Sequence, residues 1–199
     1  MYYEYGETEL THLRKKDKKL GAEIERIGMI KRKVNPNLFA SLIESVIGQQ
    51  ISSKAAATVC SRLNEICGMQ PDKLHLLTEK EIQACGMSNR KAAYIKNIAN
   101  AYVNNIIDFV NLKEKSDRQV IDILTTIPGI GAWTAEMLLI FSLKRPNVIS
   151  YGDLAIRRAM MKLYGHKDLP KERFLRFAKR YSPYASVASL YLWEISTNK

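Results

Sequence analysis

Apolar residues recur along this chain at helical spacing, and the alternation typical of strands is almost absent. Between residues 8 and 28, leucines and isoleucines lie among charged residues in a pattern that predicts two short helices meeting near Asp17. The stretch from Asn35 to Asn37 contains a proline, stops the pattern and opens a new helix. We therefore predict an all-α protein of about ten helices joined by short connections.

Residues that cap helix N-termini precede several of these segments. The expected starts are Ser52 or Ser53, Thr78 in a capping box with Glu81, Ser88, and Ser116 in a capping box with Gln119. The helix after Ser52 or Ser53 is expected to end at Gly68. The helix after Ser88 has an apolar stripe of Ile95, Ile98, Ala99, Tyr102 and Ile106.

The balance of charge favours a polyanionic partner. Lysine and arginine number 31 against 20 aspartates and glutamates, which gives a formal net charge of +11 over 199 residues. A surplus of this size is typical of proteins that bind nucleic acid, and the alternative is a cationic surface that is merely solvated. Arg157 and Arg158 are candidates for phosphate contacts, with plain solvation as the alternative.

Membrane insertion and secretion are not expected. No apolar run approaches the ~20 residues that cross a bilayer, and the polar start lacks the apolar core of a signal peptide. We expect a cytoplasmic location, or a nuclear one if the source is eukaryotic. Cys60, Cys67 and Cys85 form an odd set without a CxxC pair, so neither a disulfide framework nor a structural zinc site is expected.

The stretch "LTTIPGIGAWTAEMLL", residues 124–139, carries two glycines one residue apart after a proline. A dinucleotide fingerprint is one interpretation, and Asp153 lies near the distance expected for its ribose-binding acid. Three observations oppose it: Thr134 holds the third glycine position, Pro128 interrupts the strand that should precede the turn, and no parallel sheet is predicted.

A second interpretation is a turn between two helices that binds DNA phosphate. A helix over residues 117–125 ends at the glycines, and a new helix begins near Ala132. Glycines permit positive φ, and unpaired N–H groups of the turn and of the new helix attract a phosphate without reading a base. The donors expected to contact DNA are Gly129, Ile130, Gly131, Ala132 and Thr134. A plain interhelical turn that only requires glycine remains the alternative.

This segment, followed by "SYGDLAIRRAM", resembles the helix-hairpin-helix DNA glycosylase superfamily. Residues 38–63 are similar to the preceding segment of its 3-methyladenine DNA glycosylase II (AlkA-type) branch, and residues 182–195 resemble the closing helix of that branch. The resemblance covers roughly residues 8–196, and the larger relatives add an N-terminal β-domain that is not in this sequence. It implies one glycosylase unit over residues 1–199 with two helical lobes and a cleft between them. Residues 37–112 would form most of one lobe, and residues 1–36 with 113–199 the other.

The resemblance implies a monofunctional glycosylase that hydrolyses the bond between an alkylated purine and deoxyribose in duplex DNA. Asp153 aligns with the catalytic aspartate, whereas spacing alone favours a helix N-cap, and both roles can coexist. Branches that cut the strand carry lysine in the hairpin where this chain has Trp133, and the iron–sulfur branches carry four C-terminal cysteines, whereas the last cysteine here is Cys85. A glycosylase for deaminated or oxidised bases, and a non-catalytic DNA-binding module, remain the alternatives.

The remaining site residues also follow from the resemblance. The substrate pocket is expected to contain Trp133, Trp193, Tyr151, Met137 and Gln49, with Tyr191 as a neighbour. Aromatic rings there would stack on a cationic base, and the chain departs from the branch at Met137 and Glu194, where aromatics are frequent. Asn89 or Met87 would enter the base stack, beside phosphate contacts from Arg90 and Arg157. The carbonyls of Thr125, Ile127 and Ile130 would hold Na⁺ or K⁺; no other cofactor and a monomeric protein are expected.

Overall fold

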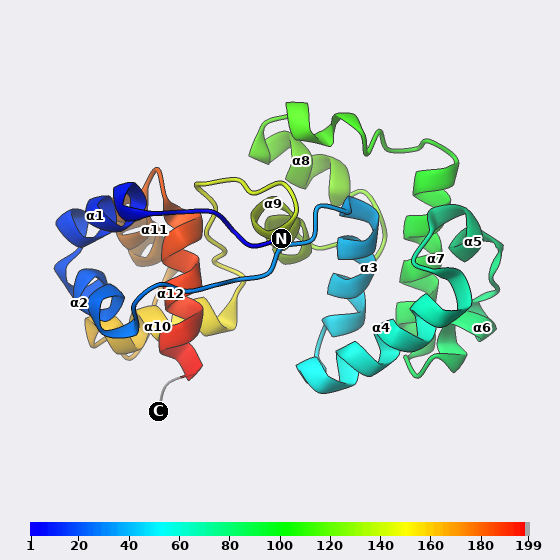
Figure 1. Ribbon diagram of the computed structural model, residues 1–199, viewed down its shortest axis with the longest axis horizontal. Coiled ribbons are helices and arrows are strands. Elements are labelled where there is room, and N and C mark those ends of the chain that lie inside the picture. The colour runs from blue at the N-terminus through cyan, green and yellow to red at the C-terminus, as the bar shows by residue number, and fades with distance from the viewer. Residues whose placement is uncertain (198–199) are drawn as a thin grey trace. The chain divides into compact units, whose positions relative to one another are not determined.

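The computed structural model describes residues 1–197, which are helical apart from turns, loops and one isolated β-bridge between Tyr2 and Lys33 (Figure 1). The prediction of an all-α fold is confirmed. The chain divides into two compact units. Unit 1 contains Met1–Val34 and Lys144–Lys199, and unit 2 contains Asn35–Leu143.

Unit 1 is built on the C-terminal helix. Its helices are α1 (Glu7–Lys16), α2 (Lys18–Ile27), α10 (Leu154–Tyr164), α11 (Lys171–Tyr181) and α12 (Ala185–Thr197). The helix α12, red in Figure 1, packs against α2, α10 and α11, and nine of its residues from Ala185 to Ile195 are buried. The predicted break at Asp17 is present: its Oδ1 accepts a hydrogen bond from the N–H of Leu20, and its Oδ2 accepts one from the hydroxyl of Tyr164 at 2.7 Å.

Unit 2 is organised around α3 and α7. Its helices are α3 (Leu38–Gly48), α4 (Ser53–Cys67), α5 (Pro71–Leu76), α6 (Glu79–Ala84), α7 (Asn89–Val103), α8 (Asp117–Leu124) and α9 (Ala132–Phe141), with a 3-10 turn, η1, at Asn111–Glu114. The helix α7 packs against α3, α5 and α6, and α3 also packs against α4 and α9. The predicted caps are confirmed at Ser52, Thr78, Ser88 and Ser116.

Two expectations differ from the structure, and one short helix was not expected. Residues 113–143 group with residues 35–112, not with the N-terminus, because α9 packs on α3 and α8 packs on α9. The apolar stripe does not extend to Ile106: α7 ends at Val103, Asn105 has a φ of +51°, and Ile106 is 69% exposed. The short helix α5 was not predicted.

Within residues 1–197, no helix has both the length and the apolar character needed to cross a membrane.

Candidate functional site

Asp153 lies in unit 1 at the start of α10, and its carboxylate is held from two directions. Its Oδ1 accepts a hydrogen bond from the N–H of Ile156 at 3.0 Å, so the N-cap expected from the sequence is present. Its Oδ2 accepts a hydrogen bond from the indole Nε1–H of Trp193 in α12 at 3.1 Å. The side chain is buried, with 7% of the residue exposed. A carboxylate at a helix N-terminus is stabilised by the free N–H groups and by the helix dipole.

Two of the aromatic side chains expected in the pocket, Trp193 and Tyr151, each contact an arginine within unit 1. The guanidinium carbon of Arg32 lies 5.9 Å from the ring centroid of Trp193. Arg157 lies over Tyr151 at 5.2 Å, and the edge-on ring of Phe174 contacts Tyr151 at the same centroid distance. These cation–π contacts orient rings and guanidinium groups together. Arg157, expected at a phosphate, and Tyr151, expected in the substrate pocket, are therefore a contacting pair.

Tyr191, expected as a neighbour of the pocket, is fully buried and has a structural contact. Its hydroxyl donates to the carbonyl of Gly28 at 3.0 Å, which ties α12 to the loop after α2. Burial raises the pKa of this hydroxyl. Glu194 follows Trp193 on the same helix and is partly exposed.

The hairpin between α8 and α9 lies in unit 2. The N–H of Ile130 donates to the carbonyl of Ile127 at 3.1 Å, so the expectation that the amides of this turn are unpaired is wrong for Ile130. Gly131 is the N-cap of α9 and provides no side-chain cap, and Gly131, Ala132 and Trp133 are exposed. The first turn of α9 therefore presents its N–H groups without a capping side chain, as an anion site requires. The side chain of Thr134 is buried in unit 2.

Gly129 is the position of the hairpin at which glycine is required. Its φ is +99°, and a Cβ placed there would lie 2.2 Å from Cγ of Tyr94. Tyr94 also contacts Arg90. The Nε of Arg90 donates a hydrogen bond to the tyrosine hydroxyl at 2.5 Å, and its guanidinium carbon lies 5.4 Å from the centroid of the tyrosine ring. Arg90 and the hairpin are thus connected through a tyrosine that the sequence analysis did not single out.

Gln49 and Met137 lie beside the hairpin in unit 2. The Nε2 of Gln49 approaches the carbonyl of Gly129 at 3.5 Å and Oγ1 of Thr134 at 3.4 Å, both long hydrogen bonds. Met137 is buried, whereas Trp133 has 36% of its surface exposed. Of these expected pocket residues, Trp133 is therefore the one most accessible to a ligand, and Gln49 braces the turn.

The backbone cation site remains a prediction. The carbonyl of Ile127 already accepts a hydrogen bond from Ile130, and a carbonyl oxygen has a second lone pair for a metal ion. The hydroxyl of Thr125 donates to the carbonyl of Ile121 at 2.8 Å, so it is directed back into α8. Among residues 1–197, no three histidine, cysteine, aspartate or glutamate side chains gather as a metal site would require.

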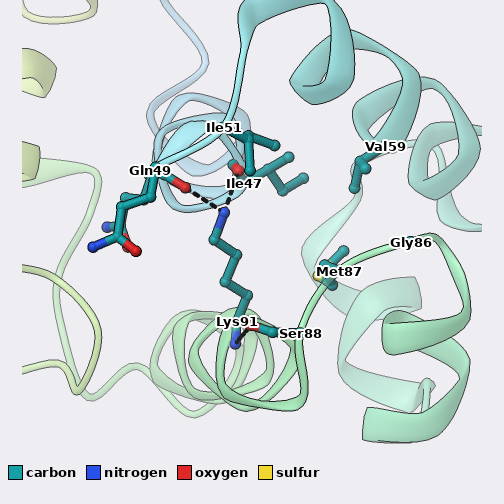
Figure 2. Close-up of a pocket in the computed structure, with 9 residues that line it drawn as sticks. Ile47, Gln49, Ile51, Val59, Gly86, Met87, Ser88 and Lys91 are labelled. Carbon is teal, nitrogen blue, oxygen red and sulfur yellow. Dashed lines mark hydrogen bonds between the residues drawn. The ribbon is translucent and has the colours of Figure 1, made fainter.

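A cavity of about 240 Å³ in unit 2 separates the end of α3 from the start of α7 (Figure 2). It is lined by Ile47, Gln49, Gln50, Ile51, Val59, Gly86, Met87, Ser88 and Lys91. Figure 2 shows Lys91 reaching across it, and its Nζ donates to the carbonyls of Ile47 at 2.7 Å and Gln49 at 2.5 Å. Partial burial lowers the pKa of Lys91.

The two residues expected to enter the base stack differ in their setting. Met87 lines this cavity and is partly buried, whereas Asn89 is exposed in the first turn of α7. Gln50 also lines the cavity, is exposed and has a φ of +59°, which is unusual for a residue with a side chain. The sequence does not indicate this conformation, because glutamine is not a residue type that favours positive φ.

Comparison with known proteins places this arrangement in one family. A family model described as "HhH-GPD superfamily base excision DNA repair protein" matches residues 43–183. DNA-3-methyladenine glycosylase 1 of Schizosaccharomyces pombe is 35% identical over 164 residues, which cover 79% of this chain and 72% of that protein. The DNA-3-methyladenine glycosylase of Saccharomyces cerevisiae is 29% identical over 199 residues, covering 80% and 67% of the two chains.

Solved structures agree with the sequence relatives. The crystal structure of DNA-3-methyladenine glycosidase from Bacillus halodurans matches with a TM-score of 0.85 and 33% identity, covering 100% of this chain and 93% of that one. The Schizosaccharomyces pombe 3-methyladenine DNA glycosylase in complex with abasic DNA matches with a TM-score of 0.83 and 31% identity, covering 94% and 95%. The resemblance found in the sequence is confirmed, and the chain belongs to the HhH-GPD superfamily of base excision DNA repair proteins.

Proposed function

We propose that this protein is a DNA glycosylase that hydrolyses the bond joining an alkylated purine to deoxyribose in duplex DNA. The observation that carries the proposal is the buried carboxylate of Asp153, fixed by an amide and an indole N–H at the start of α10 in a chain of this family. The relatives with similar sequences and structures are named as 3-methyladenine glycosylases, which favours alkylated bases over deaminated or oxidised ones.

The proposed reaction replaces the base with water at C1′ of the sugar. The C1′–N bond breaks first, and the bonding electrons leave with the base, so a cationic alkylated purine departs as a neutral molecule. The positive charge moves to the sugar as an oxocarbenium ion, which the carboxylate of Asp153 stabilises. Water then forms the new C1′–O bond, and its proton passes to that carboxylate or to solvent. The products are the free base and an abasic strand.

The strand is expected to remain uncut after base release. Glycosylases that also cut the strand use an amine that attacks C1′ and forms a Schiff base. The hairpin position at which strand-cutting branches carry lysine is Trp133 here, whose side chain has no nucleophilic amine. We therefore assign hydrolysis to this chain and no lyase step.

Trp133 is the residue that we assign to recognition of the damaged base. It lies in the first turn of α9 and is 36% exposed, so one part of the ring is accessible and another is packed. An electron-rich indole face attracts a base that carries a formal positive charge, and the attraction grows when water is excluded. A neutral purine lacks this contribution, which gives the site a physical basis for selecting alkylated bases.

Contact with the DNA backbone is assigned to the hairpin and to nearby arginines. Gly131 and Ala132 offer N–H groups at the start of α9. Arg90 is exposed and bonds to Tyr94, the residue against which the hairpin packs. Such contacts hold the duplex without reading sequence, which suits an enzyme that must find damage anywhere. One carboxylate and one hairpin suffice for one lesion, so we propose that the protein acts as a monomer.

A panel of duplexes tests the function directly. Each duplex carries one lesion: 3-methyladenine, 7-methylguanine, hypoxanthine or 8-oxoguanine. We expect release of the two alkylated bases, measured by chromatography of the free base, and an intact strand until alkali cleaves the abasic site. Release of only hypoxanthine or 8-oxoguanine would assign a different lesion. Binding without release of any base would assign a non-catalytic DNA-binding module.

A further inference from the structure

The indole of Trp193 contacts Asp153 through its N–H and not through its ring face. The Nε1 of Trp193 and the Oδ2 of Asp153 are 3.1 Å apart, within hydrogen-bonding range. The other carboxylate oxygen is held at 3.0 Å by the N–H of Ile156. A donor on each oxygen restricts both the position and the rotation of the carboxylate.

The ring of Trp193 is itself held by Arg32. The guanidinium carbon of Arg32 is 5.9 Å from the indole centroid, within the range of a cation–π contact, so a cation of the protein already occupies that side. Arg32 also has a buried Nε without a hydrogen-bond partner. The contact with the indole therefore compensates part of the cost of burying this Nε.

The loop that carries Arg32 is anchored at three points within unit 1. Tyr191 donates to the carbonyl of Gly28 at 3.0 Å, and Tyr5 bonds to both backbone groups of Ile30 at 2.8 and 2.9 Å. The N–H of Tyr3 donates to the carbonyl of Arg32 at 2.8 Å. Arg32 is thus part of a braced segment that presents its side chain to the indole, and Tyr191 anchors the same segment from the same helix as Trp193.

We propose that Trp193 is a positioning residue that orients the carboxylate of Asp153, with Arg32 holding the indole in place. This inference rests on the proposed function, and it replaces the role expected for Trp193 from the sequence, an aromatic ring that stacks on the base. Stabilisation of an oxocarbenium ion depends on where the carboxylate oxygen lies, and a displacement of about 1 Å can cost roughly 10²-fold in rate. The N–H of the indole, not its ring, is therefore the group that the reaction requires.

The kinetic test is Trp193→Phe, which keeps an aromatic ring beside Arg32 and removes the N–H. Under single turnover on a duplex with 7-methylguanine, we expect base release to slow by about 10–100-fold, with the enzyme concentration for half-maximal rate changed less than about 3-fold. The ring-preserving control Tyr184→Phe, just before α12, should keep the wild-type rate. A Trp193→Phe variant with wild-type rate would overturn the proposal.

A spectroscopic test is independent of activity and of the folding of Trp193→Phe. In ¹⁵N-labelled protein the two tryptophans give two indole N–H resonances, which Trp133→Phe assigns. We expect Asp153→Asn to shift the Trp193 resonance and speed its exchange with solvent, while the Trp133 resonance stays in place. An unchanged Trp193 resonance would overturn the hydrogen bond. The two failures are distinguishable, because a wild type that releases no base overturns the proposed function, whereas equal rates of base release by wild type and Trp193→Phe overturn only the role of the indole.

Discussion

At the scale of single residues, Gly129 and Gly131 form a matched pair that differs in two physical respects, the backbone conformation and the space for a Cβ. Gly129 has a φ of +99° and meets the ring of Tyr94, whereas a Cβ on Gly131 would meet nothing within 4 Å. We expect Gly129→Ala to lower the free energy of unfolding by about 2–4 kcal/mol, through left-handed strain and overpacking. Gly131→Ala should change it by less than about 0.5 kcal/mol.

Urea denaturation of both variants measures this difference. Because Tyr94 also carries Arg90, Gly129→Ala should weaken binding to undamaged duplex as well. Equal stability of the two alanine variants would mean that the hairpin backbone does not have the conformation described here.

Trp133 allows a second test at this scale. If its ring face stacks on a cationic base, Trp133→Ala should reduce binding of a duplex with 7-methylguanine by about 5–30-fold, the range for a loss of 1–2 kcal/mol. Undamaged duplex should lose much less. Fluorescence anisotropy on both duplexes gives the comparison, and equal losses on the two would contradict the stacking role.

At the scale of elements, lysines of α7 cap the C-terminal ends of neighbouring helices. Lys91 donates to the carbonyls of Ile47 and Gln49 at the C-terminal end of α3, and Lys96 donates to those of His75 and Leu77 at the C-terminal end of α5. A cation is favourable at a helix C-terminus because it satisfies free carbonyls and opposes the negative end of the dipole. These two contacts join α7 to the helices that pack against it.

Removal of the Lys91 contacts should loosen the turn after α3. We expect Lys91→Met to lower the free energy of unfolding by about 1–3 kcal/mol, since two carbonyl acceptors lose a charged donor. The control Lys80→Met, at an exposed position of α6, should be within about 0.5 kcal/mol of the wild type. Chemical denaturation of both variants decides the point, and a Lys91→Met protein as stable as the control would show that the turn holds without its lysine.

Elements with strong local signals could be predicted from the sequence. Caps at Ser88 and Ser116 and the break at Asp17 were found because a single polar residue precedes each apolar pattern. The helix α5 was not predicted because its six residues are too few to show the helical period of apolar positions. The end of α7 was placed too late because Ile106 continues the spacing, while Asn104 and Asn105 turn the backbone away.

Only the parts of the site that belong to sequence motifs could be predicted. The hairpin and Asp153 stand out in the sequence, but the contacts between them and distant residues depend on packing. The hydrogen bond from Trp193 spans 40 positions, and Tyr94 approaches Gly129 across 35 positions. No residue type at Arg32 or Tyr94 signals these contacts, since arginines and tyrosines are common on helices and in loops.

At the scale of the whole molecule, the net charge of +11 should control how the protein finds DNA. If about five phosphates are contacted, the affinity for undamaged duplex should fall by roughly 10²–10³-fold between 50 and 200 mM salt. Arg157→Gln should reduce the slope of log Kd against log salt concentration by about 1. Anisotropy titrations at four salt concentrations test both statements, and a salt-independent affinity would contradict an electrostatic mode of binding.

The central claim is that the carboxylate of Asp153 drives base release, and Asp153→Asn isolates that claim. Asparagine also caps a helix, so its side-chain oxygen can still accept from Ile156 and the fold should persist. The most direct measurement is single-turnover release of 7-methylguanine by wild type and Asp153→Asn, with melting temperatures compared in parallel. We predict release at least about 10²-fold slower in the variant at a similar melting temperature. Equal rates of release would contradict the account.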